Sequence, residues 1–168
     1  MPITHHAIDL VFRARKLIKQ VSVIKVAELC DAGTARLLDL RDVQELKDAV
    51  TIPTAYHAPR GMLEFWADPQ SPYHKYVFST DRKLILFCAS GMRSALATKT
   101  LKDMGMTNVI DMEGGFTEWK MQGLPVKYLN LGRRAGPAPY SRRRERPAYG
   151  VKRGVKHRSG IRVYGQVV

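Results

Sequence analysis

The sequence predicts an α/β fold, with a mainly parallel sheet of about five strands flanked by helices on both faces and a basic C-terminal extension. Two short segments rich in apolar residues, at 35–40 and 83–88, are typical of strands buried on both faces of a parallel sheet. Helical patterns alternate with these segments, which indicates βαβ units. The 168 residues, 45% of them hydrophobic, suffice for one compact domain and an appendage, and exclude a wholly disordered or collagen-like chain.

The expected elements follow from periodicity and from glycines that end them. They are a helix over 7–21, a short apolar stretch at 21–26, a helical pattern at 27–32 ended by Gly33, a strand at 35–40, a strand at 83–88, a helix from 93 to Gly105, a strand at 108–112, and a helix over 116–122. The segment 51–79 is too long for a simple connection. We expect it to form a loop or short-helix excursion beside the functional site.

The N-terminal segment 1–20 is expected to form an amphipathic helix packed on the domain of residues 21–126, with its cations outward. Contact of its basic face with a membrane, or a role as a transit sequence, is the alternative. His5 and His6 are adjacent, so their side chains diverge and do not predict a shared metal. The sequence gives no reason to expect a metal or a cofactor.

The charge is uneven along the chain. The formal net charge is +13, of which residues 1–126 carry +2 and residues 127–168 carry +11. The last segment therefore predicts a flexible, basic, solvated tail. Its three tyrosines, Tyr140, Tyr149 and Tyr164, lie among the cations, so a weak contact with RNA or another polyanion is a further hypothesis.

Only two cysteines occur, Cys30 and Cys88, and their separation predicts neither a disulfide framework nor a zinc site. The longest apolar run is far shorter than the roughly 20 residues that cross a bilayer, and no signal peptide is recognisable. We therefore expect a cytosolic protein without a membrane contact. Cys30 is interpreted as a small buried hydrophobic residue.

Cys88 stands at the carboxyl end of a predicted strand, where ligands of parallel sheets bind. Gly91 allows the following loop to curl so that its amides point inward, and Arg93 adds a cation. These features stabilise a thiolate, the reactive form of cysteine. The same loop would hold an anionic substrate through its other members, Ala89, Ser90, Gly91, Met92 and Ser94.

Three motifs in order give the chain a resemblance to the single-domain rhodaneses, over roughly residues 20 to 126. They are the loop at 88–94, the acidic stretch 37–42 with Glu45, and the segment 113–116 followed by Trp119 and by 123–125. The resemblance implies a sulfurtransferase in which Cys88 takes a sulfane sulfur from thiosulfate or a similar donor as a persulfide. It then passes this sulfur to cyanide or a thiol acceptor. Asp39 and Arg41 match positions that we interpret as structural.

The sequence departs from that family at residues 50–55, where two usual glycines are absent, and the tail has no counterpart in it. After this turn, Arg60 could reach the pocket and help to bind an anion, or could be an outward surface residue.

Two other functions remain open. A cysteine phosphatase of the same fold needs five residues between its Cys and Arg, whereas four separate Cys88 from Arg93. A non-catalytic binding module with an RNA- or polyanion-binding tail is the second alternative. The retained Cys88, Gly91 and Arg93 favour an enzyme over this module.

Overall fold

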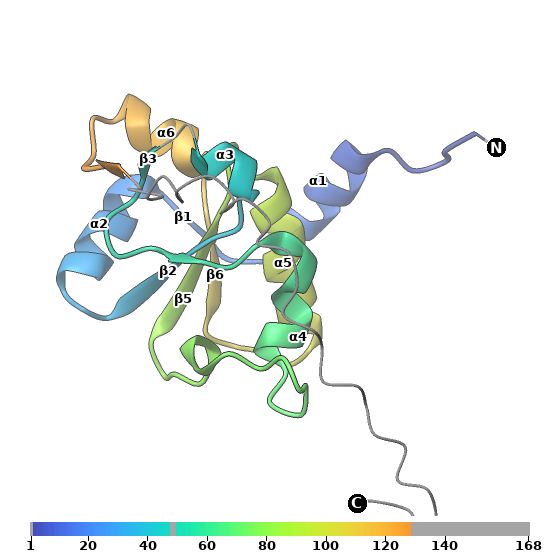
Figure 1. The fold of residues 1–168 in the computed structure, drawn as a ribbon. Coiled ribbons are helices and arrows are strands. Elements are labelled where there is room, and N and C mark those ends of the chain that lie inside the picture. The colour runs from blue at the N-terminus through green and yellow to red at the C-terminus, as the bar shows by residue number, and fades with distance from the viewer. Residues whose placement is uncertain (1, 48–49, 129–168) are drawn as a thin grey trace, which may run out of the picture. The chain divides into compact units, whose positions relative to one another are not determined.

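The structure is a computed structural model that describes residues 2–47 and 50–128. Its helices and strands alternate along the chain (Figure 1). They are α1 (Ala7–Leu17), β1 (Gln20–Val21), α2 (Val23–Asp31), β2 (Ala35–Asp39), α3 (Val43–Lys47), β3 (Val50–Thr51), β4 (Tyr56–His57), α4 (Leu63–Ala67), β5 (Lys83–Phe87), α5 (Met92–Asp103), β6 (Val109–Met112), α6 (Gly115–Met121) and β7 (Lys127–Tyr128). Single 3-10 turns lie at Arg60–Met62 and Tyr76–Phe78.

Five of these strands form one parallel sheet in the order β1-β6-β5-β2-β4, which confirms the predicted fold class. The register places Asp39 opposite Phe87, and Leu86 opposite Asp111. The carboxyl ends of the three central strands therefore meet at one edge of the sheet, and Cys88 follows directly after the middle one.

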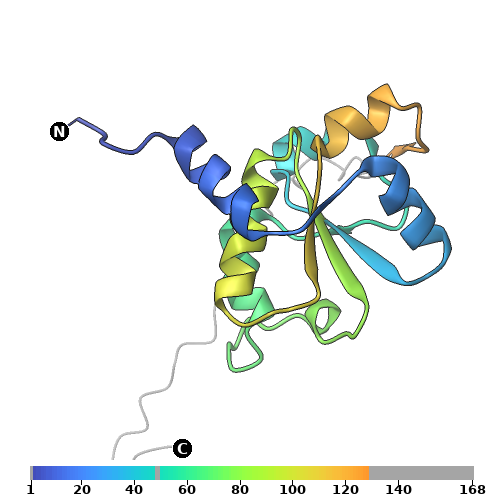
Figure 2. The ribbon, with the colours of Figure 1, turned by 180° about the vertical axis from the view of Figure 1, so that it is seen from behind.

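Helices cover both faces of the sheet, as Figures 1 and 2 show from opposite sides. Successive strand residues point to opposite faces, so each strand contributes to both cores. On one face, Leu84 and Leu86 pack with Leu101 of α5 and Leu63 of α4. On the other face, strand residues pack with α2 and α6, for example Ile85 with Phe116 and Trp119.

The N-terminal helix packs on the domain as expected, with Val11 and Ala14 buried and α5 as its neighbour. It ends at Leu17 instead of Val21, because the next residues enter the sheet as edge strand β1. Its outer face is not purely cationic, since Phe12 is 56% exposed. Within 2–47 and 50–128, every helix is too short or too polar to span a bilayer.

The second helix begins earlier than predicted. Ser22 is its N-cap, with a side-chain oxygen that accepts a hydrogen bond from the backbone N–H of Lys25. The helix thus runs from Val23 to Asp31, and the apolar stretch that the sequence analysis left unassigned supplies its buried residues Val23 and Val26. A serine cap outweighs the moderate helix propensity of the following β-branched residues.

Two other expectations need correction. The excursion at 51–79 contains not only short helices but also β4, which pairs with β2 at the edge of the sheet. The predicted tail begins two residues too early, because Lys127 and Tyr128 form β7 and pair antiparallel with β3. The remainder of the tail, 129–168, lies outside the described residues.

Candidate active site

Cys88 occupies the expected position at the end of β5, but its side chain is buried, with only 1% of its surface exposed. The sulfur lies at the border of the α5-side core, beside the leucines of that cluster. The hydroxyl of Ser94 in α5 donates a hydrogen bond to Sγ over 3.7 Å. The thiol is therefore buried and not exposed at the surface of the loop.

The loop after Cys88 is held against the start of α6. The backbone N–H groups of Phe116 and Thr117 donate to the carbonyl oxygens of Cys88 and Ala89, over 2.8 and 2.9 Å. Because a trans peptide directs its C=O and N–H to opposite sides, the N–H groups of Ala89 and Ser90 point away from α6. Neither has an acceptor among the described residues, so both can bind an anion.

Two glycines make this packing possible. Gly91 has φ +81°, a left-handed conformation, and begins α5 as its N-cap. Gly115 has φ +61°, and a Cβ on it would lie 2.6 Å from the carbonyl oxygen of Cys88 and 2.8 Å from the amide nitrogen of Gly91. No side chain fits there, which explains why a Gly-Gly pair appears in the late motif.

The other loop residues surround the buried thiol. Ser94 is fully buried and Ala89 is half-buried, while Ser90 and Met92 are exposed. The exposed part of the loop thus lies at Ser90 and Met92, beside the two free amides.

Arg93 does not lie free beside the thiol as the sequence analysis expected. Its guanidinium donates to both carboxylate oxygens of Glu45 in α3, each over 2.7 Å, and Asp42 lies 3.6 Å away. The hydrogen bonds to Glu45 raise the pKa of Arg93, and the charges of Cys88, Glu45 and Asp42 add to this effect. The same hydrogen bonds lower the pKa of Glu45 to about 2. Arg93 therefore fastens α3 to the loop while it keeps a positive charge near the sulfur.

The structural interpretation of Asp39 and Arg41 is confirmed. Both side chains are buried, and Arg41 donates to the Asp39 carboxylate through Nε and through Nη2, the latter over 2.6 Å. Thr51 donates to the same carboxylate over 2.8 Å. The guanidinium also lies 4.0 Å from the ring centre of Phe116 in α6. The pair thus joins the end of β2 to the helix on which the Cys88 loop rests.

Arg60 is not brought to the site. Its guanidinium donates to Glu64 over 2.6 Å, one helical turn away, and is about one-third exposed. In the described part of the chain it has no hydrogen bond or ion pair with residues 88–94. The structure thus pairs Arg60 with Glu64, and a part for Arg60 in anion binding stays a prediction.

The sequence analysis missed one buried polar group, Asp111 of β6. Its side chain is fully buried, and Gln20 of β1 donates to its Oδ2 over 2.8 Å. Its neighbourhood includes Ser94, which hydrogen-bonds the sulfur, and Arg15 of α1. A lone Asp inside an apolar strand, in Val-Ile-Asp-Met, was the sequence signal for this group.

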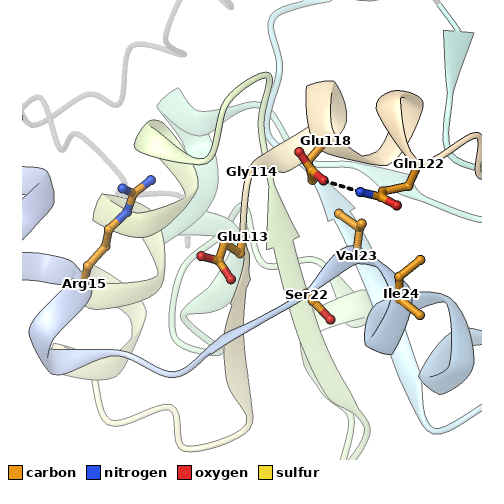
Figure 3. Close-up of a pocket in the computed structure, with 8 residues that line it drawn as sticks. All are labelled: Arg15, Ser22, Val23, Ile24, Glu113, Gly114, Glu118 and Gln122. Atoms are coloured by element: carbon orange, nitrogen blue, oxygen red, sulfur yellow. Dashed lines mark hydrogen bonds between the residues drawn. The ribbon is translucent and has the colours of Figure 1, made fainter.

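A cavity of about 500 Å³ lies next to the loop, between α1, the start of α2 and the start of α6 (Figure 3). In Figure 3, Arg15 lies on one side of the lining residues and Val23 and Ile24 on the other, with Glu113 and Gly114 between them. Arg15 also reaches the loop itself, since its Nη2 would lie 3.5 Å from a Cβ on Gly91. Among the described residues, no group of three His, Cys, Asp or Glu side chains is arranged to hold a metal ion.

Comparison with known proteins shows the family of the chain. The model of the rhodanese-like domain family matches residues 22–122. The thiosulfate sulfurtransferase 16 of Arabidopsis thaliana, a chloroplastic protein, is 33% identical over 115 residues, which cover 64% of this chain and 91% of that protein.

Two solved structures are also similar. One, from Rhodopseudomonas palustris, is described as a protein of unknown function and possible tyrosine phosphatase. It is 39% identical, with a TM-score of 0.72 over 76% of this chain and 98% of that chain. The human single-domain sulfurtransferase is 28% identical, with a TM-score of 0.52 over 61% of this chain and 96% of that chain.

Proposed function

Since the chain belongs to the rhodanese-like domain family, we propose that it is a sulfurtransferase that carries a sulfane sulfur as a persulfide on Cys88. One observation carries the proposal. The Cys88 sulfur accepts a hydrogen bond from Ser94. The carbonyl oxygens of Cys88 and Ala89 hold the loop on α6, while the N–H groups of Ala89 and Ser90 point the other way and have no acceptor among the described residues. This is a site for one nucleophilic sulfur and a small anion.

The proposed reaction has two displacement steps. The Cys88 thiolate attacks the outer sulfur of thiosulfate, so that a new S–S bond forms while the bond inside thiosulfate breaks and sulfite leaves with the electron pair. A thiophilic acceptor, cyanide or a thiolate, then attacks the outer sulfur of the persulfide. This bond formation regenerates the Cys88 thiolate and releases thiocyanate or a new persulfide.

The burial of Cys88 fits a persulfide carrier. An S–S bond of about 2 Å extends the reactive atom from the buried Sγ toward the exposed side of the loop. There the N–H groups of Ala89 and Ser90 stabilise the anionic persulfide and donor, with the charge of Arg93 behind them. Ser94 holds the inner sulfur during both steps.

The description of the Rhodopseudomonas structure makes a phosphatase the second candidate. Two features of this chain disfavour it. Only four residues separate Cys88 from Arg93, and both terminal nitrogens of the Arg93 guanidinium already donate hydrogen bonds to Glu45. A phosphatase would need these two donors to bind the transferred phosphoryl group.

The test is the intact mass of the protein after incubation with thiosulfate. We expect the mass of one added sulfur, its removal by cyanide, and its absence in Cys88→Ala. Cys30→Ala is the matched control, because Cys30 lies in α2, and this variant should still gain the sulfur. An unchanged mass in the wild type, together with hydrolysis of a phosphotyrosine peptide, would replace this proposal with the phosphatase.

For the tail we propose a weak, non-specific contact with RNA or another polyanion, on the basis of its charge alone. Truncation after Tyr128 keeps β7 and removes most of that charge. We expect the full chain to bind a single-stranded RNA with an affinity that falls steeply with salt, and the truncated chain to lose this binding. Equal binding by the two chains would refute the contact.

A further inference from the structure

Asp111 of β6 lies opposite Leu86 of β5, which precedes Cys88 by two residues. Val109, two residues earlier in β6, belongs to the same core cluster as Cys88. Because side chains two residues apart on a strand point to the same face of the sheet, Asp111 points to the face that α5 covers. No part of the carboxyl is exposed. Gln20 donates to Oδ2, but Oδ1 has no hydrogen-bond partner among the described residues. A buried carboxyl with one unsatisfied oxygen is costly in its charged form.

The polar and charged groups that act on Asp111 come from α1, β1, α5 and the end of β6. They are Arg15 of α1, Gln20 of β1, Ser94 of α5 and Glu113 at the end of β6. Burial raises the pKa of Asp111 to about 6, and Glu113 adds to this, whereas Ser94, Gln20 and Arg15 act in the opposite direction. The carboxyl therefore titrates near neutral pH.

Ser94 connects this carboxyl to the thiol. It has one hydroxyl hydrogen, which it donates to Sγ of Cys88, and it also faces Asp111. When Asp111 is charged, it competes with the sulfur for that hydrogen and repels a thiolate. When Asp111 is protonated, its own proton can be donated to Ser94 Oγ, which leaves the Ser94 hydrogen for the sulfur. A negative sulfur and a neutral Asp111 thus stabilise each other.

We propose that Asp111 is a positioning residue that, through Ser94, sets the pH at which Cys88 becomes a thiolate. This inference deepens the proposed function, because it concerns the nucleophile assigned there. The residues that support Asp111, Arg15 and Gln20, precede the segment matched by the family model. The N-terminal segment therefore tunes the site as well as extending the sheet.

The test follows the ultraviolet absorbance of the thiolate as a function of pH, with no sulfur donor present. The chain carries Cys30→Ala, so that Cys88 is its one remaining cysteine. A Cys88→Ser chain at each pH provides the blank. We expect Asp111→Asn to lower the midpoint of Cys88 ionisation by about one pH unit, because a nearby anion is removed. In a Ser94→Ala background the same substitution should shift the midpoint by less than half as much.

Thr98→Val is the matched control. Thr98 is a second buried hydroxyl on α5, one turn beyond Ser94, and it has no hydrogen bond to the sulfur. Its replacement should leave the midpoint unchanged. An unchanged midpoint in Asp111→Asn, or an equal shift with and without Ser94, would overturn the proposal.

A reciprocal measurement uses the protein with Asp111 intact. The carbon-13 resonance of the Asp111 carboxyl should shift once when Asp111 itself loses its proton and again when Cys88 ionises. The second shift should vanish in Cys88→Ser. Its persistence in Cys88→Ser would contradict the coupling. Because neither readout requires sulfur transfer, a protein that shows the coupling but accepts no sulfur refutes the proposed function and leaves this inference standing.

Discussion

Two buried carboxyls flank the strand that carries Cys88, and their surroundings differ. Asp39, on β2, receives hydrogen bonds from the Arg41 side chain, the Arg41 backbone N–H and Thr51. Asp111, on β6, receives one from Gln20 and keeps an unpaired oxygen in the described part of the chain. Both are essentially inaccessible to water.

The difference separates a structural group from a titrating one. A buried charge that is fully paired fixes the geometry around it, whereas a buried charge with too few donors is driven toward its neutral form. Asp39 therefore fixes the support of the Cys88 loop. Asp111 retains the freedom to gain or lose a proton next to the thiol.

The largest expected effect comes from Asp39→Asn. The substitution removes the counter-ion of Arg41, whose side chain is only 3% exposed. An unpaired buried cation should lower the free energy of unfolding by about 3 to 5 kcal/mol. Urea denaturation at pH 7 measures it, and a loss below about 1 kcal/mol would show that the pair is not structural.

The same substitution at Asp111 should have the opposite sign. The folded state raises the pKa of this carboxyl from 3.8 to about 6. The unfolded chain therefore releases the proton first, and the wild type loses stability as the pH rises from about 4 to above 6. Asp111→Asn avoids this loss, which corresponds to at most about 3 kcal/mol. Urea denaturation should show the gain at pH 7.5 and none at pH 3.5; a destabilised variant at pH 7.5 would contradict it.

Thr98→Val tests a second buried polar group, the Thr98 hydroxyl, that lacks a hydrogen-bond partner among the described residues. Replacing it with a methyl group of similar shape should raise the free energy of unfolding by about 1 kcal/mol. Thermal unfolding checks the sign. Destabilisation would show that this hydroxyl is hydrogen-bonded in solution.

The smallest effect is expected at the half-exposed pair of Glu45 and Arg93. Solvent screens it, so Glu45→Gln should cost no more than about 1 kcal/mol at pH 7. Folding lowers the pKa of Glu45 to about 2. The contribution of the wild-type pair is thus complete above about pH 4.5 and fades as the pH falls toward 2. Variant and wild type should converge in acid; a difference that persists at pH 2 would contradict the ionic origin.

Much of the fold could be predicted because its central strands are buried on both faces and are rich in apolar residues. The short edge strands could not. β1, β4 and β7 have two residues each, too few for a pattern, and they exist because a neighbouring strand pairs with them. The early end of α1 has the same origin, since Gln20 and Val21 pair with β6 instead of extending the helix.

For the candidate site, the sequence determined that Cys88 follows a strand and that Gly91, Arg93 and Ser94 follow in the same loop and helix start, because these positions are adjacent in the chain. Only the tertiary structure decided the rest. It buried the sulfur, bound Arg93 to Glu45, and brought Arg15 and Ser94 to Asp111. Local sequence sets backbone conformation, but the burial and partner of a charge depend on chain segments that are distant in sequence and meet only in the folded molecule.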